Sequence, residues 1–442
     1  MSAAAPARTV AARVLARVEA DDAWADLALA AEVTRAALAP RDIGLATEIV
    51  YGTLRWQRYL DWILAPHSRR SIAALDPRVR VALRMAAYQL VFLERVPPFA
   101  VVNDAVSLAR GRTPGLAQYT NAVLRSFTRR GAREAPAPRD AVEALATRCS
   151  FPTWLAARWL ERYGVHDAEA LMRALNARPP VTLRVNTLRV TREALAARLA
   201  AENDLMTRPT PHAPDGLIAA RGGEPGAWNA FIEGACVAQD EASMLVARLL
   251  EPAPGETVAD ACAAPGTKTT HLAQLMENRG RILAIDPQPD RLARVQEAVK
   301  RLGISIVDTL AATAQESART RAATCDAVLV DAPCSNLGVL RRNPEVKWRR
   351  RPEDLAAAAA RQREILAAAA TLVKPGGRLV YATCSLEPEE NEAVVDPFLG
   401  AHPEFRLDPP AAFPVALEGG VLRLRPDRLD TDGFTAVRLR RA

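Results

Sequence analysis

The second half of the chain, from about residue 240 onward, alternates short apolar strands with helices. The strand candidates are residues 257–261, 281–285, 305–308, 327–330 and 378–381. Helices follow most of them, for example at 271–276 and 291–302. Continuous apolar strands between helices are typical of a parallel sheet covered on both faces. The pattern predicts a doubly wound α/β domain over residues 241–442, in which ligands bind at the carboxyl ends of the strands.

The beginning of the chain has a helical pattern instead. From residue 8 to about 130, apolar residues recur at a spacing of three to four, and no strand-like alternation interrupts them. This spacing predicts an all-helical bundle over residues 1–135. The segment 131–139 is rich in Ala, Pro and charge, a composition typical of a linker.

Between these two regions lies a stretch of mixed pattern. A helix at 154–175 stops at Pro179, and a short strand at 181–185 and a helix at 191–201 follow. We expect a helical linker and a small α/β subdomain over residues 140–240. The predicted fold class is therefore an N-terminal all-α bundle, a small α/β linker subdomain and a C-terminal Rossmann-like domain with a doubly wound sheet.

Composition excludes several classes of protein. No apolar run approaches the ~20 residues needed to span a bilayer, and residues 1–10 do not have the pattern of a secretory signal. None of the six cysteines forms a C-x-x-C pair, and no histidine lies at zinc-ligand spacing from two of them. We expect reduced thiols in a cytoplasmic, monomeric protein without a metal site.

The net charge of +7 is unevenly distributed along the chain. Residues 1–150 hold 21 Lys/Arg against 14 Asp/Glu, a surplus of 7, whereas the remaining residues balance at 37 against 37. A positive field confined to one domain suits an acidic polymer such as RNA. Arginine is used heavily throughout the chain, however, so solvated helix faces would give the same count.

A candidate cofactor turn follows the first strand of the α/β domain. The strand ends at Asp260, and the turn contains Cys262, Ala263, Ala264, Pro265, Gly266, Thr267 and Lys268. It is neither a P-loop, because Thr267 separates Gly266 from Lys268, nor a G-x-G-x-x-G turn. Asp286 ends the next strand, where a carboxylate can bind a ribose diol. Pro-Gly turns and strand-end aspartates are common in α/β domains, but together they favour a nucleoside-type cofactor held through its ribose and the backbone.

Two cysteines follow the fourth and fifth strands. Asp331 and Cys334 belong to D-A-P-C-S after the fourth strand, and Cys384 belongs to A-T-C-S after the fifth. The ends of parallel strands share one edge of a sheet, so we expect these three side chains to converge beside the cofactor turn. A lone cysteine is more often inert core, but two at equivalent strand ends favour a shared chemical role.

Methylation at carbon 5 of cytosine is a reaction that suits such a set. That carbon is too weak a nucleophile to accept a methyl group directly, whereas addition of a thiolate to carbon 6 makes it enamine-like. A carboxyl group at ring N3 assists the addition, and a base must then remove the carbon-5 proton before the thiol can leave.

The sequence resembles the Sun/Nop family of RNA 5-methylcytosine methyltransferases, and in particular its bacterial members that act on 16S rRNA of the small subunit. The motifs that carry the resemblance are C-A-A-P-G-T-K-T (262–269), Asp286, D-A-P-C-S-N-L-G-V-L-R-R-N-P (331–344), A-T-C-S (382–385), L-E-P-E-E-N (386–391), Q-D-E-A-S (239–243) and D-G-F (432–434). Their order and spacing over about 200 residues make chance a poor explanation.

The resemblance implies a role for each matching residue. Cys384 would be the nucleophile that adds to carbon 6 of cytosine, and Cys334 would assist product release. S-adenosyl-L-methionine would be the cofactor, with Asp286 on its ribose and residues 262–268 along its methionine and backbone. Asp331 would contact the base or the cofactor. Asp308 matches the family's acidic residue after the third strand.

Three positions depart from the family pattern, although none of them is a reacting group. Thr267 stands where a second glycine is usual, Thr309 follows Asp308 in place of glycine, and Thr435 follows D-G-F in place of an aromatic residue.

A basic loop and the N-terminal helices are the candidate RNA contacts. Arg341, Arg342, Lys347 and Trp348 lie shortly after D-A-P-C-S and could hold phosphates and a flipped base. Alone, the loop would equally suit a solvated helix start. The N-terminal helices resemble a NusB-like RNA-binding domain through Y-G-T-L-R-W (51–56), V-N-D-A-V (102–106) and N-A-V-L-R (121–125).

Three alternatives remain open at this point. The chain could methylate cytosine in tRNA or another RNA, or it could be an rRNA-binding assembly factor without catalysis. It could also be a DNA cytosine methyltransferase, a class in which the nucleophile follows the fourth strand, where Cys334 stands here.

Overall fold

The structure, a computed structural model, describes residues 6–111, 113–132, 140–220, 223 and 225–442. The chain forms two compact units, each made of separate stretches of sequence. Met1–Ala177 and Leu340–Arg350 form one, here called the helical unit, and Arg178–Val339 and Arg351–Ala442 form the other, the α/β unit. Most of the linker predicted at 131–139 lies outside the described residues.

The units differ from the predicted domains in two places. The helix predicted at 154–175 belongs to the helical unit, and so does a short segment taken from the middle of the methyltransferase-like sequence. Among the described residues, no helix has both the length and the apolarity that crossing a membrane would require.

The helical unit is all-α, as the apolar spacing predicts. Its helices are α1 (Pro6–Ala20), α2 (Ala25–Ala36), α3 (Pro40–Arg55), α4 (Gln57–Leu64), α5 (Pro77–Phe92), α6 (Pro98–Leu108), α7 (Leu116–Arg130), α8 (Ala141–Arg148), α9 (Thr153–Asn176) and α16 (Val346–Arg349). The central helix α5, which Asp76 caps through the Arg78 N–H, is buried on two sides. Val81 and Met85 pack against α1 and α3, and Leu83 packs against α4 and α7. One helix thus joins two apolar clusters.

The segment Leu340–Arg350 is held by backbone carbonyls at helix ends. Lys347 Nζ donates to the Arg55 carbonyl at 2.8 Å and to Asn176 Oδ1 at 2.9 Å. Trp348 Nε1 donates to the Leu54 carbonyl at 2.7 Å. The last carbonyls of a helix have no partner within the helix, so these two side chains complete the end of α3.

The basic loop predicted to bind RNA is therefore largely occupied within the protein. Arg341 and Lys347 are each only 1% exposed, and the Arg341 carbonyl accepts a hydrogen bond from Arg55 at 3.0 Å. Arg342 and Trp348 are half-buried. Arg341 and Lys347 cannot reach an RNA phosphate in this arrangement, which corrects the prediction for these two residues.

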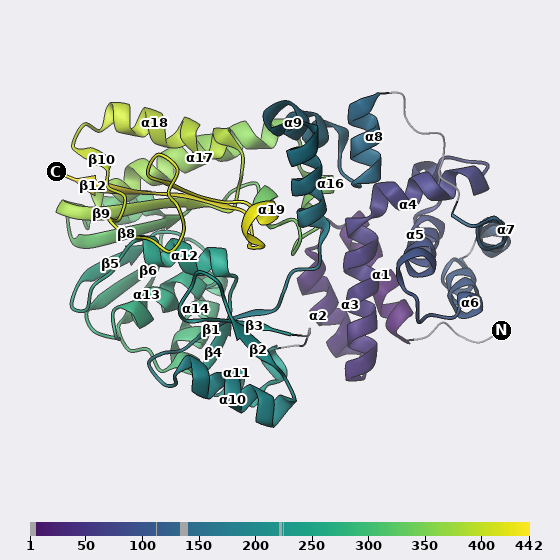
Figure 1. Ribbon diagram of the computed structural model, residues 1–442, viewed down its shortest axis with the longest axis horizontal. Coiled ribbons are helices and arrows are strands. Elements are labelled where there is room, and N and C mark those ends of the chain that lie inside the picture. Colours follow the sequence, from purple (N-terminus) through teal and green to yellow (C-terminus); the bar gives the residue numbers. More distant parts are fainter. Residues whose placement is uncertain (1–5, 112, 133–139, 221–222, 224) are drawn as a thin grey trace. The chain divides into compact units, whose positions relative to one another are not determined.

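The α/β unit is built on one large sheet with the strand order β10-β12-β9-β8-β5-β6-β7, and β11 pairs with β12 (Figure 1). The strands are β5 (Thr257–Asp260), β6 (Arg281–Asp286), β7 (Val307–Ala311), β8 (Cys325–Asp331), β9 (Val373–Thr383), β10 (Phe405–Leu407), β11 (Val421–Leu424) and β12 (Phe434–Arg441). The five predicted strands, β5 to β9, are present and parallel. Beyond the predicted strands, the sheet has an antiparallel edge made of β10, β11 and β12.

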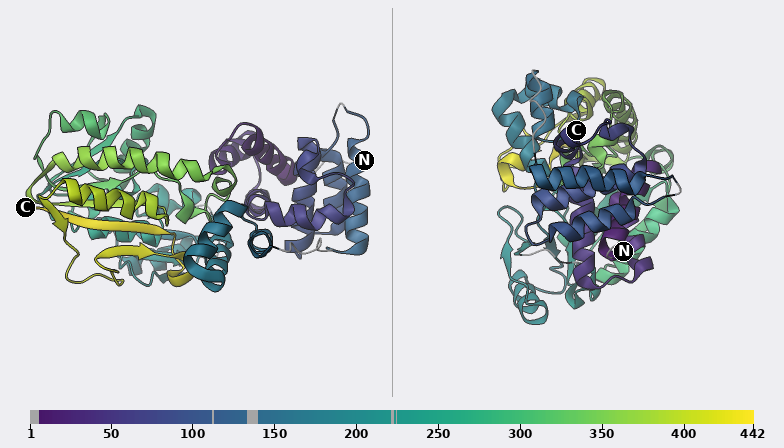
Figure 2. Two further views of the ribbon diagram at one scale, coloured as in Figure 1. Left: turned by 90° about the horizontal axis from the view of Figure 1, so that it is seen from above. Right: turned by 90° about the vertical axis from the view of Figure 1, so that its right-hand side faces the viewer.

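Helices cover both faces of this sheet, as the doubly wound prediction requires. One face is covered by α12 (Glu241–Leu249), α13 (Thr267–Leu275) and α14 (Pro289–Leu302), and the other by α17 (Pro352–Thr371) and α18 (Glu392–Ala401), with α15 (Ala314–Ala318) packed against α17. Neighbouring strand residues alternate between the two apolar clusters: Ile282 packs with α12 and α13, and Leu283 with α17. In Figure 2 the light green helices run alongside the yellow C-terminal strands.

A smaller antiparallel sheet precedes the large one within the α/β unit. Its order is β2-β3-β1-β4, with β1 (Thr182–Val185), β2 (Thr207–Pro209), β3 (Gly216–Ala219) and β4 (Cys236–Ala238). The helices α10 (Arg192–Asn203) and α11 (Asn229–Ile232) accompany it, and α19 (Pro426–Leu429) lies between β11 and β12. The predicted strand at 181–185 and helix at 191–201 correspond to β1 and α10.

The buried Lys347 amine gives the first testable prediction. Burial, and then the Arg55 guanidinium, lower the pKa of Lys347 well below its ordinary value. In the unfolded chain the amine titrates at ~10.4, so between the lowered folded-state pKa and that value the unfolded state binds more protons than the folded state. As the pH falls from 9 to 7, the wild-type protein should therefore lose up to about 1.4 kcal/mol of unfolding free energy per pH unit relative to Lys347→Met.

Urea unfolding of both proteins at pH 7, 8 and 9 measures this difference. Lys300→Met, on the exposed side of α14, is the matched control and should run parallel to the wild type. A Lys347→Met profile that also runs parallel to the wild type would show that the buried amine keeps its ordinary pKa.

Candidate functional site

A cavity of about 470 Å³ opens at the carboxyl ends of the parallel strands. Its walls come from the segments after β5, β6, β7, β8 and β9, together with two residues of α17 and one residue at the start of β12. The lining residues include Cys262, Ala264, Asp286, Gln288, Arg291, Thr313, Gln315, Asp331, Cys334, Asn336, Arg361, Cys384 and Phe434. The convergence expected from the strand pattern is therefore present, with Asp331, Cys334 and Cys384 in one wall.

The two cysteines lie side by side in this wall. Their sulfur atoms are 2.9 Å apart. Asn336, which has a left-handed backbone with φ of 63°, places its amide oxygen 2.9 Å from Cys384 Sγ and 3.6 Å from Cys334 Sγ. One amide group thus contacts both thiols, a feature that the sequence reading did not single out.

The ionisation of Cys384 depends on its neighbours. The hydrogen bond with Cys334, burial and the negative charge of Asp331 together hold the pKa of Cys384 well above its ordinary value, and Lys268 acts in the opposite direction. Lys268 Nζ donates to Asp331 Oδ2 at 2.6 Å and lies 4.9 Å from the Phe434 ring centre. Burial alone would lower the pKa of Lys268, but Asp331 raises it, so the lysine remains a cation behind the cysteines.

Asp286 occupies the position expected of a ribose ligand. Its carboxylate is almost fully buried at the end of β6 and accepts a hydrogen bond from the Gln288 N–H at 3.0 Å. Arg291 NH1 lies 3.3 Å from the other carboxylate oxygen, and Arg291 NH2 donates to the Ala264 carbonyl at 2.8 Å. One arginine thus ties Asp286 to the turn after β5.

That turn is shaped by packing against the protein itself. Gly266 has a φ of 101°, and a Cβ there would meet the Val295 Cα at 3.1 Å. Glycine is therefore needed for the contact of this turn with α14. Ala263, Pro265, Gly266, Thr267 and Lys268 do not line the cavity, in contrast to Cys262 and Ala264.

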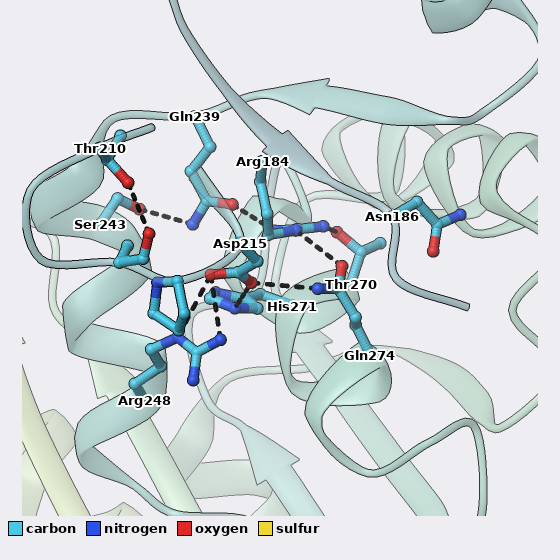
Figure 3. Close-up of polar contacts among 12 residues, drawn as sticks. Arg184, Asn186, Thr210, Asp215, Gln239, Ser243, Arg248, Thr270, His271 and Gln274 are labelled. Atoms are coloured by element: carbon cyan, nitrogen blue, oxygen red, sulfur yellow. Dashed lines mark hydrogen bonds and ion pairs between the residues drawn. The ribbon is translucent and has the colours of Figure 1, made fainter. Parts of the chain in front are cut away.

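A buried arginine from the small sheet holds the start of α13 (Figure 3). Arg184 NH1 donates to the Thr267 carbonyl at 2.7 Å, and NH2 donates to Thr270 Oγ1 at 2.9 Å. Its Nε donates to Gln274 Oε1 at 3.2 Å, and Gln239 also accepts from NH1. All four acceptors are neutral: one backbone carbonyl, one threonine hydroxyl and two glutamine side-chain oxygens. Arg184 is therefore held by hydrogen bonds and not by direct contact with a carboxylate.

A second buried group beside Arg184 fixes the same helix. Asp215 accepts hydrogen bonds from Gln274 Nε2 at 3.0 Å and pairs with His271 Nε2 at 2.8 Å and Arg248 NH2 at 3.0 Å. Burial lowers the pKa of His271 to about 4. Side chains from the small sheet and its loops thus hydrogen-bond to the first two turns of α13.

One predicted cofactor ligand is misplaced. Asp308 lies in the middle of β7, because the strand continues to Ala311. Its side chain is 59% exposed and pairs with Arg281 Nε at 2.8 Å, outside the cavity. The segment that does follow β7 supplies Thr313 and Gln315 to the cavity wall.

A local sequence pattern could have located that wall. Thr313 and Glu316 form a capping box at the start of α15, and the T-x-x-E pattern is visible in the sequence. Arg361 and Phe434 also line the cavity. They come from α17 and β12, and no local pattern associates them with the strand ends.

Comparison with family models divides the chain into three matching regions. Residues 5–129 match the NusB family, and residues 151–223 match a ferredoxin-like domain of RsmF/B-like methyltransferases. Residues 247–440 match the model described as 16S rRNA methyltransferase RsmB/F.

Individual relatives match nearly the whole chain. A Bacillus subtilis protein named "Probable ribosomal RNA small subunit methyltransferase B" is 37% identical, covering 98% of each chain. "Ribosomal RNA small subunit methyltransferase B" of Pseudomonas putida is 37% identical, covering 90% of each chain.

Two solved structures are similar as well. The crystal structure of PH0851 has a TM-score of 0.84 at 32% identity and covers 99% of this chain and 100% of its own. That of NSun6 from Pyrococcus horikoshii with SFG has a TM-score of 0.60 at 28% identity and covers 66% and 98%.

The fold, the motif-bearing strand ends and these matches lead to one assignment. The resemblance and the fold class predicted from the sequence are confirmed, and the chain belongs to the RsmB/F family of 16S rRNA methyltransferases, with an N-terminal NusB-family domain.

Proposed function

We propose that this protein is an S-adenosylmethionine-dependent RNA (cytosine-5-)-methyltransferase that acts on 16S rRNA. The observation that carries the proposal is the pair of thiols 2.9 Å apart at the ends of two parallel strands. They open, together with Asp331, into a cavity that also contains the strand-end carboxylate Asp286. Two thiols and a carboxyl group beside a nucleoside site are the groups that carbon-5 methylation needs.

The cavity suits S-adenosyl-L-methionine in size and chemistry. Its volume of about 470 Å³ lies within the range usual for small-molecule sites. Asp286 would accept hydrogen bonds from the ribose hydroxyls, Cys262 and Ala264 would lie along the methionine part, and Thr313 and Gln315 would lie beside the adenine. When bound, the cofactor supplies an electrophilic methyl group.

Different side chains of the protein then carry out the successive steps of the reaction. The Cys384 thiolate adds to carbon 6 of the cytosine, forming a carbon–sulfur bond and making carbon 5 nucleophilic. With ring N3 of the cytosine protonated, the Asp331 carboxylate, held by Lys268, accepts a hydrogen bond from the N3–H, and that proton neutralises the charge that the addition places on the ring. Once carbon 5 carries the methyl group, Cys334 acts as the base that removes the carbon-5 proton. The electron pair of that bond forms the 5,6 double bond, and Cys384 leaves as a thiolate.

The choice of RNA rests on the relatives and the N-terminal domain. Relatives that match the full length are named for small-subunit ribosomal RNA. A tRNA substrate is the alternative within the enzyme class. An assembly factor without catalysis would not need two juxtaposed thiols, so the site favours an enzyme.

The division of labour between the cysteines is testable with an adduct assay. Cys384→Ala should abolish methylation and form no covalent protein–RNA complex, because the nucleophile is missing. Cys334→Ala should accumulate that complex, because the carbon-5 proton stays in place and the carbon–sulfur bond cannot break. Denaturing gels with labelled 16S rRNA measure both. The reverse pattern would assign the nucleophile to Cys334, as in DNA cytosine methyltransferases.

Bisulfite sequencing of total RNA from a deletion strain identifies the substrate. One 16S rRNA cytosine that loses protection, and regains it with the wild-type gene but not with Cys384→Ala, supports the proposal. Loss of protection confined to tRNA would replace 16S rRNA by tRNA as the substrate.

The raised pKa of Cys384 predicts a shift in thiol reactivity. The thiolate is the reactive form, and the hydrogen bond with Cys334 is the largest cause of the raised pKa. Cys334→Ala should therefore move the pH profile of Cys384 alkylation by iodoacetamide to lower pH, and Asp331→Asn should do so to a smaller extent. Mass spectrometry of the Cys384 peptide between pH 7 and 10 measures the profile. Cys325→Ala, in the core at the start of β8, should leave it unchanged, and an unchanged profile in Cys334→Ala would contradict the coupling.

The Arg184 contacts predict a loss of cofactor affinity on substitution. Arg184→Met removes the charged donors that fix the Thr267 carbonyl and the Thr270 hydroxyl. One hydrogen bond from a charged donor contributes about 1.5–3 kcal/mol to stability. The Kd for S-adenosylmethionine should rise at least about tenfold, as measured by calorimetry.

The matched control for Arg184→Met is Arg301→Met. Arg301 donates to the Cys236 carbonyl of the small sheet at 3.0 Å without touching the turn. The Arg301→Met protein should keep the wild-type Kd for S-adenosylmethionine. An Arg184→Met protein that binds the cofactor as tightly as the wild type would show that the turn holds its shape unaided.

A further inference from the structure

Glu390 is a fully buried carboxylate that the proposed reaction does not use. It belongs to L-E-P-E-E-N (386–391), ends the short 3-10 turn η5 (Pro388–Glu390) and is 0% exposed. Burying a carboxylate is costly unless its oxygens are fully hydrogen-bonded. The hydrogen-bond partners of Glu390 therefore indicate the role of this carboxylate in the structure.

Those partners come from the two loops that carry the cysteines. Glu390 Oε1 accepts from the Ser335 N–H at 2.7 Å, and Oε2 accepts from the hydroxyl groups of both Ser335 and Ser385. The two serine hydroxyls are themselves 3.2 Å apart. One carboxylate thus receives three hydrogen bonds from two residues that are 50 positions apart in the sequence.

Each of these serines directly follows one of the two cysteines. Ser335 comes after Cys334, and Ser385 comes after Cys384. A peptide unit is rigid, so fixing a serine backbone restricts where the preceding cysteine can place its side chain. Glu390 therefore lies behind the thiol pair and joins the two loops on the side away from the cavity.

Glu390 is in turn held by the rest of the domain. Gln362 Nε2 of α17 donates to Glu390 Oε1 at 3.0 Å and to the Pro333 carbonyl at 3.0 Å. The Tyr381 hydroxyl of β9 donates to the Glu390 carbonyl at 2.7 Å. The carboxylate is thus a fixed point to which both loops are attached.

We propose that Glu390 is a positioning residue that sets the separation of the Cys334 and Cys384 thiols. Strand pairing aligns β8 with β9 only as far as Asp331 and Ala382. Beyond that point the pairing of β8 with β9 stops, and the Glu390 hydrogen bonds join the two segments together with one backbone bond, from the Gly338 N–H to the Cys384 carbonyl at 2.9 Å. The proposal rests on the function proposed above, in which one thiol must add and the other must reach the same base.

The thiol separation can be measured without RNA or cofactor. Phenylarsine oxide exchanges its oxygen for two thiol sulfurs, releasing one water, and binds tightly only where two thiols are close together. Wild-type protein should bind it, and Cys334→Ala and Cys384→Ala should each lose that binding. Glu390→Ala should bind it about 10²-fold more weakly, because the second thiol no longer adds intramolecularly.

The conservative variant separates positioning from folding. Glu390→Gln has the same size, its amide oxygen can accept from Ser335 N–H and Gln362, and its NH2 group can donate to the serine hydroxyls. It should retain arsenical binding. Glu389→Ala, the neighbouring half-buried carboxylate, is the matched control and should behave as the wild type.

Kinetics give an independent measure of the same displacement. A misplacement of about 1 Å at a reacting group can cost about 10²-fold in rate. Glu390→Ala should therefore lower kcat by about that factor, leave the KM for S-adenosylmethionine unchanged, and be rescued in Glu390→Gln. A structural defect spread over the domain would change KM and kcat together.

The outcomes are distinguishable. Wild-type arsenical affinity in Glu390→Ala overturns the proposal. If Glu390→Ala does not fold, the double variant Ser335→Ala/Ser385→Ala replaces it, since Glu390 keeps the Ser335 N–H and Gln362 donors. Weak arsenical binding there supports the proposal, and wild-type binding overturns it. A wild-type protein that binds the arsenical but methylates no cytosine carbon 5 refutes the proposed function alone.

Discussion

The site depends on the parallel pairing of β8 with β9. Because the two strands run in the same direction, their pairing ends in both chains at one level, where Asp331 is paired with Ala382. Cys334 and Cys384 follow within three and two residues of these positions. An antiparallel pairing would send the two cysteines to opposite edges of the sheet. The helices on both faces are therefore part of the chemistry, since a parallel sheet is stable only when both faces are covered.

Buried polar side chains fix the turns and loops that strand pairing does not reach. Arg184 holds the turn after β5 through neutral acceptors, and Glu390 joins the two cysteine loops. In the helical unit, Lys347 completes the end of α3 in the same way. The buried charges of Arg184 and Glu390 cost solvation free energy that an apolar side chain would not, whereas burial of Lys347 lowers its pKa and favours the neutral amine. In each case the hydrogen-bond partners include backbone groups or short hydroxyl side chains near the end of a helix or strand. Hydrogen bonds fix the direction of the chain there, which apolar packing alone does not.

The sequence predicts what local periodicity determines. The five parallel strands, the all-α N-terminal part and the edge that gathers Asp331, Cys334 and Cys384 all follow from patterns within a few residues. Strand ends are less visible, because residues inside and just after a strand can have the same polarity; Asp308 was therefore placed at an end that lies three residues further on. The basic loop was misread for a different reason. The partners of Lys347 lie 292 and 171 residues away, and local composition carries no information about such contacts.

The surroundings of the two thiols are not equivalent, which bears on their roles. A nucleophile must ionise, and its thiolate needs a donor or a positive charge nearby. Asn336 does not supply that donor, because its amide oxygen accepts from the Cys384 thiol at 2.9 Å and from the Cys334 thiol at 3.6 Å. The positive charge of Lys268 favours the Cys384 thiolate, whereas burial and the neighbouring thiol oppose it. The positive charge of Lys268 is thus the feature of the surroundings that favours Cys384 as the nucleophile of the proposed reaction.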